Sequence, residues 1–126
     1  MSTGPGIDPT TRPFFEGAAR GELWLQRCET CGTHQHYPRP HCLSCASFTL
    51  SFVRVAGDGV VYSRTRVHRQ VREDLPAPYV VGLVELDEGP RLLALLGDED
   101  LTIEERVRLT WKAEQDAPIL VAFRRA

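Results

Sequence analysis

The sequence predicts a mostly β protein with a short N-terminal helix, a lobe held together by cysteines, and a C-terminal barrel of short strands. Three observations predict this fold class. The chain has 126 residues, enough for one compact domain or for a small barrel with an attached lobe. All four cysteines lie between residues 28 and 45, a stretch with almost no aliphatic side chains. Strand-like runs separated by turn residues fill the chain after residue 48.

The chain before the cysteines is expected to form a tail and a helix. Residues 1–11 contain two Gly, two Pro and four Ser or Thr, a composition typical of a disordered tail. Residues 12–20 predict a short helix, and residues 23–25 a brief strand. The helix signals are a proline in the first turn, two apolar residues on one face and a glycine at the end: Pro13, Phe14, Ala18 and Gly21.

The rest of the chain reads as β-structure. The strand-like runs are 48–56, 59–69, 79–87, 91–97, 106–112 and 118–124, and residues 101–105 allow one helical turn. Strong turn signals at 57–59 and 87–90 separate some of them. Short strands of this number suit a small closed or partly closed antiparallel barrel. The predicted domains are therefore a tail (1–11), a helix with a cysteine lobe (12–47) and a barrel (48–126).

Alternation within the strands predicts which faces are buried, because successive strand residues point to opposite faces. The apolar side chains of run 106–112 fall on one face, and Ile119, Val121 and Phe123 are expected to fall together on another. In run 59–69 one face is small and suited to packing in a barrel. The other face is basic and aromatic, with Tyr62, Arg64, Arg66 and His68.

The cysteines form two C-x2-C pairs separated by ten residues: Cys28, Cys31, Cys42 and Cys45. Each pair can make a tight turn that aims two thiolates at one point, and four thiolates around Zn²⁺ form a closed structural site. Metal binding is favoured over two disulfides because the chain reads as cytosolic. Zinc is favoured over iron for a site of four thiolates. The loop histidines His34, His36 and His41 are interpreted as exposed or supporting side chains.

Charge and hydropathy narrow the function classes. Fifteen Lys and Arg against 17 Asp and Glu give a net charge of −2, which disfavours a general nucleic-acid binder. The mean hides an uneven distribution, since residues 54–72 hold five arginines and residues 85–105 hold eight acids. No long apolar run or secretory signal is present, so we expect a cytoplasmic protein with no membrane association.

Candidate contact residues come from two places. The basic face of run 59–69 could bind the phosphate groups of a ligand, dock on an acidic partner, or simply be a solvated strand face. Arg39, framed by two prolines beside Tyr37, is a second candidate contact. No catalytic set is recognisable, because the cysteines are committed to metal and His68 lacks an identifiable partner.

Several motifs together resemble one family. They are the run from Phe14 through the Cys28 knuckle, Tyr37-Pro38-Arg39-Pro40 before the second knuckle, Gly57-x-Gly59-x-Val61-Tyr62-Ser63, and the segment from Tyr79 to Leu92. Over roughly residues 13–124 the sequence resembles the acyl-CoA-associated zinc-ribbon/OB-fold proteins, formerly a domain of unknown function. The sequence departs from the family pattern at Arg64, Ala46 and Glu104-Glu105.

The resemblance implies an OB-fold for the barrel, a rubredoxin-like ribbon with structural zinc, and function by association. Such proteins are accessory subunits of thiolase-superfamily enzymes (acyltransferases, aldolases or thiolases) or of hydratase partners in lipid or steroid metabolism. The expected role is to bind and support an enzyme that acts on acyl-CoA, with contact to the acyl-CoA itself as a further expectation. Catalysis by the isolated chain is not expected. The alternative is a nucleic-acid-binding zinc-ribbon/OB-fold protein, which the charge disfavours.

Overall fold

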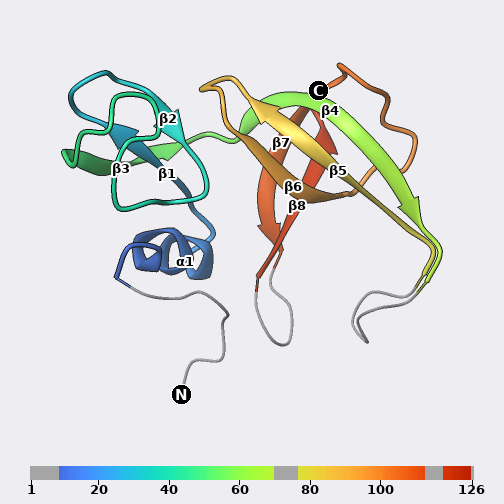
Figure 1. Cartoon of the computed structure of the whole chain (residues 1–126). Coiled ribbons are helices and arrows are strands. Elements are labelled where there is room, and N and C mark those ends of the chain that lie inside the picture. The colour runs from blue at the N-terminus through green and yellow to red at the C-terminus, as the bar shows by residue number, and fades with distance from the viewer. Residues whose placement is uncertain (1–8, 70–76, 113–117, 126) are drawn as a thin grey trace. The chain divides into compact units, whose positions relative to one another are not determined.

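The structure is a computed structural model that describes residues 9–69, 77–112 and 118–125. It confirms the predicted fold class (Figure 1): one short helix, a four-cysteine ribbon and a closed barrel. The chain divides into two compact units, Met1–Val55 and Ala56–Ala126. The predicted tail, residues 1–11, lies outside the described residues as far as residue 8.

The N-terminal unit begins with α1 (Arg12–Ala19), close to the predicted range. Phe14 and Ala18 are buried, and Pro13 sits in the first turn as predicted. The helix ends in a Schellman motif, in which Gly21 takes a φ of +76° and the Glu22 amide donates to the Gly17 carbonyl at 2.8 Å. A glycine suits this end because side chains rarely tolerate that left-handed backbone.

Three antiparallel strands complete the N-terminal unit in the order β2-β1-β3: β1 (Leu23–Cys28), β2 (His34–Gln35) and β3 (Leu50–Val55). Leu23 and Leu25 of β1 are buried and form a small core with the apolar face of α1. The strand predicted at 48–56 exists, but it was assigned to the barrel. In the structure β3 pairs with β1 along its whole length, from Leu23 opposite Val55 to Cys28 opposite Leu50.

The C-terminal unit is a five-stranded barrel closed in the order β4-β5-β6-β8-β7. Its strands are β4 (Asp58–Val67), β5 (Tyr79–Leu86), β6 (Arg91–Leu96), β7 (Arg106–Lys112) and β8 (Ile119–Arg124). All neighbours are antiparallel except β6 and β8, and β7 closes the barrel on β4. Figure 1 shows β4 as a long curved strand that wraps the barrel. Five strands in this arrangement form an OB-fold.

Two details of the barrel differ from the sequence-based prediction. Residues 101–105 form a turn rather than a helical turn, with Glu104 in the left-handed region at φ +71°. In β8 the burial does not alternate: Leu120, Val121 and Ala122 are all buried, whereas Phe123 is 45% exposed. The reason is that Phe123 packs outside the barrel, where its ring lies over Gly97 in the space that a side chain there would fill.

Candidate metal centre

Both C-x2-C turns of the ribbon close in the same way. In the first, the Gly32 amide donates to the Cys28 carbonyl at 2.8 Å; in the second, the Ala46 amide donates to the Cys42 carbonyl at 2.9 Å. Gly32 and Ala46 both adopt the left-handed backbone, with φ of +77° and +65°. The second knuckle therefore places alanine where the first uses glycine.

The two turns bring the four sulfurs together. All four Sγ atoms lie within 4.8 Å of one another, and two pairs, Cys28 with Cys45 and Cys31 with Cys42, are separated by 3.6 Å. A tetrahedral metal with metal–sulfur bonds of about 2.3 Å needs sulfurs about 3.8 Å apart. A disulfide would need about 2 Å. The observed separations therefore fit one tetrahedral metal ion and not two disulfides.

Backbone amides point at the sulfurs as they do around metal-bound thiolates. The Cys31 amide donates to Cys28 Sγ at 3.5 Å. The amides of Ser44 and Cys45 donate to Cys42 Sγ at 3.3 and 3.5 Å. Cys28 and Cys42 are buried, while Cys31 and Cys45 are exposed. These donors stabilise negative charge on sulfur, which is the form that binds metal.

The protonation of the cysteines shows why the site favours a cation. The Thr33 hydroxyl, 3.2 Å from Cys31 Sγ, and the Thr33 amide lower the pKa of Cys31 from 9.0 to about 6. The Ser47 amide favours the Cys45 thiolate, but desolvation and the other three sulfurs outweigh it and raise the pKa of Cys45 to about 12. A bound divalent ion would relieve this mutual repulsion and deprotonate all four thiols.

Two buried glutamines hold the loop between the knuckles. Gln26 on β1 lies opposite Gln35 on β2, and both side chains are buried. Gln26 accepts from the Arg39 amide at 2.9 Å and donates to the Arg39 carbonyl at 2.8 Å. Gln35 donates to the His41 carbonyl at 3.1 Å and accepts from the Leu43 amide at 3.0 Å. These hydrogen bonds fix the backbone at three alternate loop residues, Arg39, His41 and Leu43.

The sequence analysis missed this pair of glutamines. Glutamine is usually an exposed residue, and nothing in the pattern around either position distinguishes it from a surface side chain. The two glutamines become a unit only because they pair across β1 and β2 and their side-chain amides hydrogen-bond to each other. The signal is therefore tertiary, and no local motif carries it.

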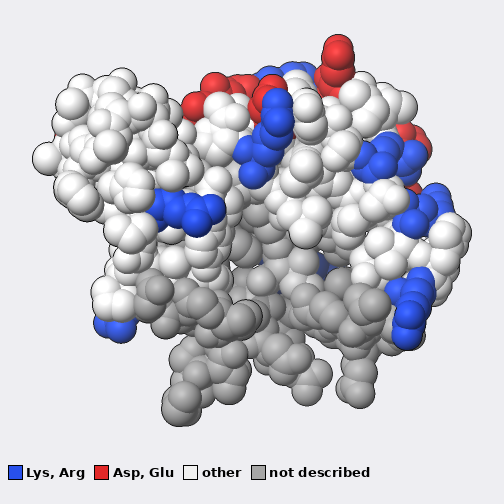
Figure 2. Space-filling view, viewed as in Figure 1, with Lys and Arg blue, Asp and Glu red and all other residues white. Residues whose placement is uncertain are grey.

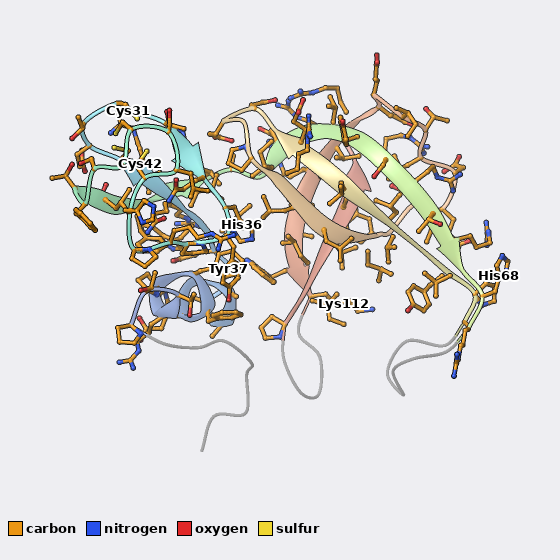
Figure 3. All side chains as sticks on the ribbon, viewed as in Figure 1. Cys31, His36, Tyr37, Cys42, His68 and Lys112 are labelled. Carbon is orange, nitrogen blue, oxygen red and sulfur yellow. The ribbon has the colours of Figure 1, made fainter. Side chains whose placement is uncertain are left out.

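The predicted contact residues of the ribbon lie in different surroundings. Tyr37 is half-buried in an aromatic cluster with Phe14, Phe15 and His36, with ring centroids 4.8 to 6.4 Å apart. Burial lowers the pKa of His36 to about 4. Arg39, by contrast, extends an exposed side chain from the loop. Figure 3 shows His36 and Tyr37 beside α1, away from Cys31 and Cys42.

The predicted contact residues on β4 do not form one face. The pairing of β4 with β5 shifts register between Val61 and Ser63, so Tyr62 is an extra residue, as in a β-bulge. Beyond the bulge Arg64 lies opposite Gly82 and Arg66 opposite the buried Val80. Because paired residues share a face, these arginines start from the inner face of the strand and lie apart from Tyr62.

Arg64 and Arg66 converge on the same residue. The Arg64 guanidinium donates to the Glu99 carbonyl at 2.7 Å, and Arg66 lies 3.6 Å from the Glu99 carboxylate. Tyr62 is 46% exposed and has the Arg91 guanidinium 3.7 Å above its ring. His68 is exposed just after the end of β4 (Figure 3). Among the β4 candidates, Arg64 and Arg66 therefore pair with Glu99, whereas Tyr62 lies against a different arginine, Arg91.

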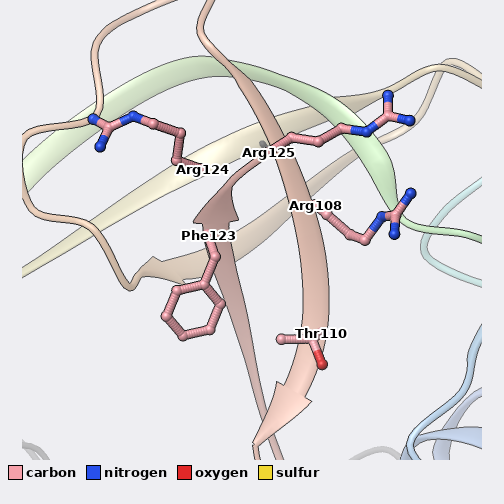
Figure 4. A pocket seen from close by; sticks show the side chains of 5 residues that line it. All are labelled: Arg108, Thr110, Phe123, Arg124 and Arg125. Atoms are coloured by element: carbon pink, nitrogen blue, oxygen red, sulfur yellow. The ribbon is translucent and has the colours of Figure 1, made fainter.

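A hollow of about 250 Å³ lies on the outside of the barrel over β7 and β8 (Figure 4). Its lining residues are Arg108, Thr110, Phe123, Arg124 and Arg125. Each arginine forms ion pairs with carboxylates. Asp58 lies 2.8 Å from Arg108 and 3.6 Å from Arg125. Arg124 pairs with Asp100 at 3.0 Å and also with Glu105. Each arginine of the hollow therefore already has a carboxylate partner.

The fold and the site together define a zinc-ribbon/OB-fold protein. The profile of the ChsH2 rubredoxin-like zinc ribbon domain matches residues 15–51, and that of the ChsH2 C-terminal OB-fold domain matches residues 52–112. A solved structure described as "Ltp2-ChsH2(DUF35) aldolase" superposes with a TM-score of 0.84 at 36% identity, covering 96% of this chain and 98% of that one. The chain belongs to this ChsH2-type DUF35 family.

Curated relatives give the family context. The chain is 38% identical over 125 residues to the "Probable enoyl-CoA hydratase alpha subunit" of Thermomonospora curvata, covering 97% of this chain and 39% of the relative. It is 32% identical over 96 residues to the "3-oxo-4,17-pregnadiene-20-carboxyl-CoA hydratase alpha subunit" of Mycobacterium tuberculosis, covering 76% of this chain and 30% of the relative. This chain thus spans less than half of either relative. In the described part of the chain, no helix has the length and apolar character that a bilayer crossing demands.

Proposed function

We propose that this chain is an accessory subunit that binds and supports a thiolase-superfamily enzyme acting on acyl-CoA. The observation that carries the proposal is the whole-length likeness to the Ltp2-ChsH2(DUF35) aldolase structure. The hydratase alpha subunits among the relatives support the acyl-CoA class of substrate. The enzyme partner supplies the catalytic residues, and the ribbon and barrel cap or stabilise its acyl-CoA channel.

Zinc is the metal that the four cysteines fit best. Four thiolate ligands at tetrahedral separations satisfy Zn²⁺ completely and leave no position for water or substrate. The ion would therefore be structural, and its binding would fold a unit whose apolar core is small. The residues that would hold it are Cys28, Cys31, Cys42 and Cys45.

Direct contact with acyl-CoA is the finer part of the proposal. A CoA phosphate needs an exposed cation, and arginine binds phosphate with two parallel hydrogen bonds. Arg64 and Arg66 are both turned toward Glu99, so a phosphate would have to displace that contact. Arg39 has no such competitor in the described chain, so its guanidinium can meet an anionic group of the ligand or of the enzyme partner.

Co-expression tests the proposal. The chain is produced together with a thiolase-like aldolase of the Ltp2 type, and the mixture is separated by size exclusion. We expect one co-eluting complex whose aldolase activity exceeds that of the enzyme alone. Separate elution, with enzyme activity unchanged by the added chain, would reject it. A single-stranded oligonucleotide run on the same column at low salt tests the nucleic-acid alternative, which co-elution would support instead.

A further inference from the structure

A long stretch of the ribbon carries almost no formal charge. From Thr30 to Val53 the only Asp, Glu, Lys or Arg is Arg39. The neighbouring arginines along the chain are paired, Arg27 with Glu29 at 3.4 Å and Arg54 with Glu22 at 3.7 Å. The Arg39 guanidinium is exposed and has no acceptor within the described residues. Figure 2 shows the corresponding white, uncharged surface on the visible side of the ribbon.

Large apolar side chains project from the same stretch. Phe48 is 78% exposed, and Leu43, next to the buried Cys42, is 63% exposed. The His41 ring lies 6.1 Å from the Phe48 ring, so the loop before the second knuckle and the chain after it meet at these two side chains. A surface poor in charge but rich in aromatic groups, with an isolated arginine, has the composition of an interface core.

The backbone beneath these side chains is fixed. The Gln26 side chain hydrogen-bonds to the backbone amide and carbonyl of Arg39. The Gln35 side chain hydrogen-bonds to the His41 carbonyl and the Leu43 amide. The Cys42 amide donates to the Ser47 carbonyl at 2.8 Å, which fixes the chain just before Phe48. Because the internal contacts already hold the backbone, the loop loses little further backbone freedom when its side chains meet a partner. Such preorganisation strengthens binding.

We propose that Arg39, His41, Leu43 and Phe48 form the surface on which the enzyme partner docks, hereafter the ribbon contact surface. The apolar side chains enter an apolar recess of the partner, and Arg39 meets a carboxylate at the rim of that recess. The inference rests on the proposed function and names the site of its interface. Charge argues against a second copy of this chain, since a two-fold contact would bring Arg39 to a surface with no acid to receive it.

Binding measurements with two variants and two matched controls test this surface. The probe is the Ltp2-type aldolase used above, and the variants are Phe48→Ser and Arg39→Met, which keeps the apolar stem of the side chain. The controls are Leu93→Ser, at a barrel residue 66% exposed, and Arg54→Met. We expect each variant to weaken binding about tenfold or more and each control less than twofold. Arg39→Met should also reduce the salt dependence of the affinity.

Folding and assembly are checked on the same samples. One metal ion per chain and unchanged Trp24 fluorescence, read in a Trp111→Phe background, show that each variant retains the ribbon. Wild-type affinity in Phe48→Ser and Arg39→Met would overturn the inference, while a wild-type complex would leave the proposed function standing. If even the wild type does not bind the aldolase, the proposed function fails instead. A wild-type homodimer that Phe48→Ser converts to a monomer would assign the surface to a second copy and overturn the inference.

Discussion

Gln26 and Gln35 lie directly opposite one another on β1 and β2, and the Gln35 amide donates to the Gln26 carbonyl oxygen at 2.6 Å. Together they satisfy four backbone groups of the loop that joins the two cysteine knuckles. Every side-chain nitrogen and oxygen of the buried pair therefore has a hydrogen-bond partner, and the pair supports the loop in place of an apolar core. Its energetic weight can be measured directly.

Gln26→Leu should destabilise the ribbon by about 2 kcal/mol, because it leaves the part-buried backbone amide and carbonyl of Arg39, and the Gln35 side-chain amide, without these partners. The measurement is urea unfolding of the zinc-loaded protein, followed by Trp24 fluorescence in a Trp111→Phe background that leaves a single tryptophan. Arg39→Met is the matched control, since it changes only the exposed side chain and should cost less than about 0.5 kcal/mol. Equal stability of Gln26→Leu and wild type would show that the pair is dispensable.

Substitutions at the two knuckles should have opposite signs. Gly32 and Ala46 share a left-handed backbone, and a side chain in that conformation costs roughly 1 kcal/mol. Gly32→Ala should therefore destabilise the ribbon, and Ala46→Gly should stabilise it by up to about 1 kcal/mol after the greater freedom of glycine in the unfolded chain is subtracted. Metal-saturated thermal unfolding measures both. A loss of stability in Ala46→Gly would contradict the strain assigned to Ala46.

Metal removal should unfold the ribbon. We expect one zinc ion per chain by elemental analysis, and a chelator should abolish the native Trp24 signal because metal binding supplies on the order of 10 kcal/mol. Cys42→Ser, at a buried ligand, should give insoluble or unfolded protein, whereas Ser44→Ala in the same knuckle should fold and bind zinc. A stable, folded, metal-free wild type would refute the structural role.

His36 should make the ribbon sensitive to mild acid. Its pKa is about 4 in the folded chain and 6.5 ordinarily, so between these values the unfolded chain binds the extra proton. Stability is then complete above about pH 6.5 and falls as the pH drops toward 4, by up to about 1.4 kcal/mol per pH unit. His36→Phe should flatten this slope relative to wild type, whereas His68→Asn, at an exposed position, should leave it unchanged. Parallel slopes for His36→Phe and wild type would exclude the effect.

Two glycines of the barrel should differ sharply in their tolerance of alanine. At Gly59 an added methyl group would strike the backbone carbonyl of Glu85, which is held in the β4–β5 ladder. At Gly97 it would meet only the Phe123 ring, which is already partly exposed and can turn away. Gly59→Ala should therefore cost about 2 kcal/mol or more, and Gly97→Ala less than about 1. Thermal unfolding of the two variants, compared with wild type, decides the order.

The sequence was most informative where the signal is local. Cysteine spacing alone predicted which four residues converge, because a C-x2-C turn fixes its own geometry. Gly21 and Pro13 likewise marked the ends of α1 correctly. The strand that β3 pairs with could not be predicted, since the residues of a half-buried strand do not indicate which sheet it joins. This is why residues 48–56 were assigned to the barrel.

The contact residues illustrate the same limit. Strict alternation placed Tyr62 and Arg64 on one face of β4, but the bulge at Tyr62 adds a residue and reverses the faces beyond it. No glycine marks that position, so the sequence gives no warning. Phe123 was expected to share a face with Ile119 and Val121, but Val121 is buried whereas Phe123 is 45% exposed and its ring lies over Gly97. Periodicity predicts burial only as far as the register continues.

The two sheets of this chain differ in whether they have open edge strands. The barrel closes on itself, so each of its strands has a neighbouring strand on both sides for at least part of its length. The ribbon sheet ends at β2 on one side and β3 on the other, and its middle strand carries the apolar run Leu23-Trp24-Leu25. Open edges beside such a run are where strands from different molecules join. Aggregation of this protein should therefore begin in the ribbon once its metal is lost, with the barrel still folded.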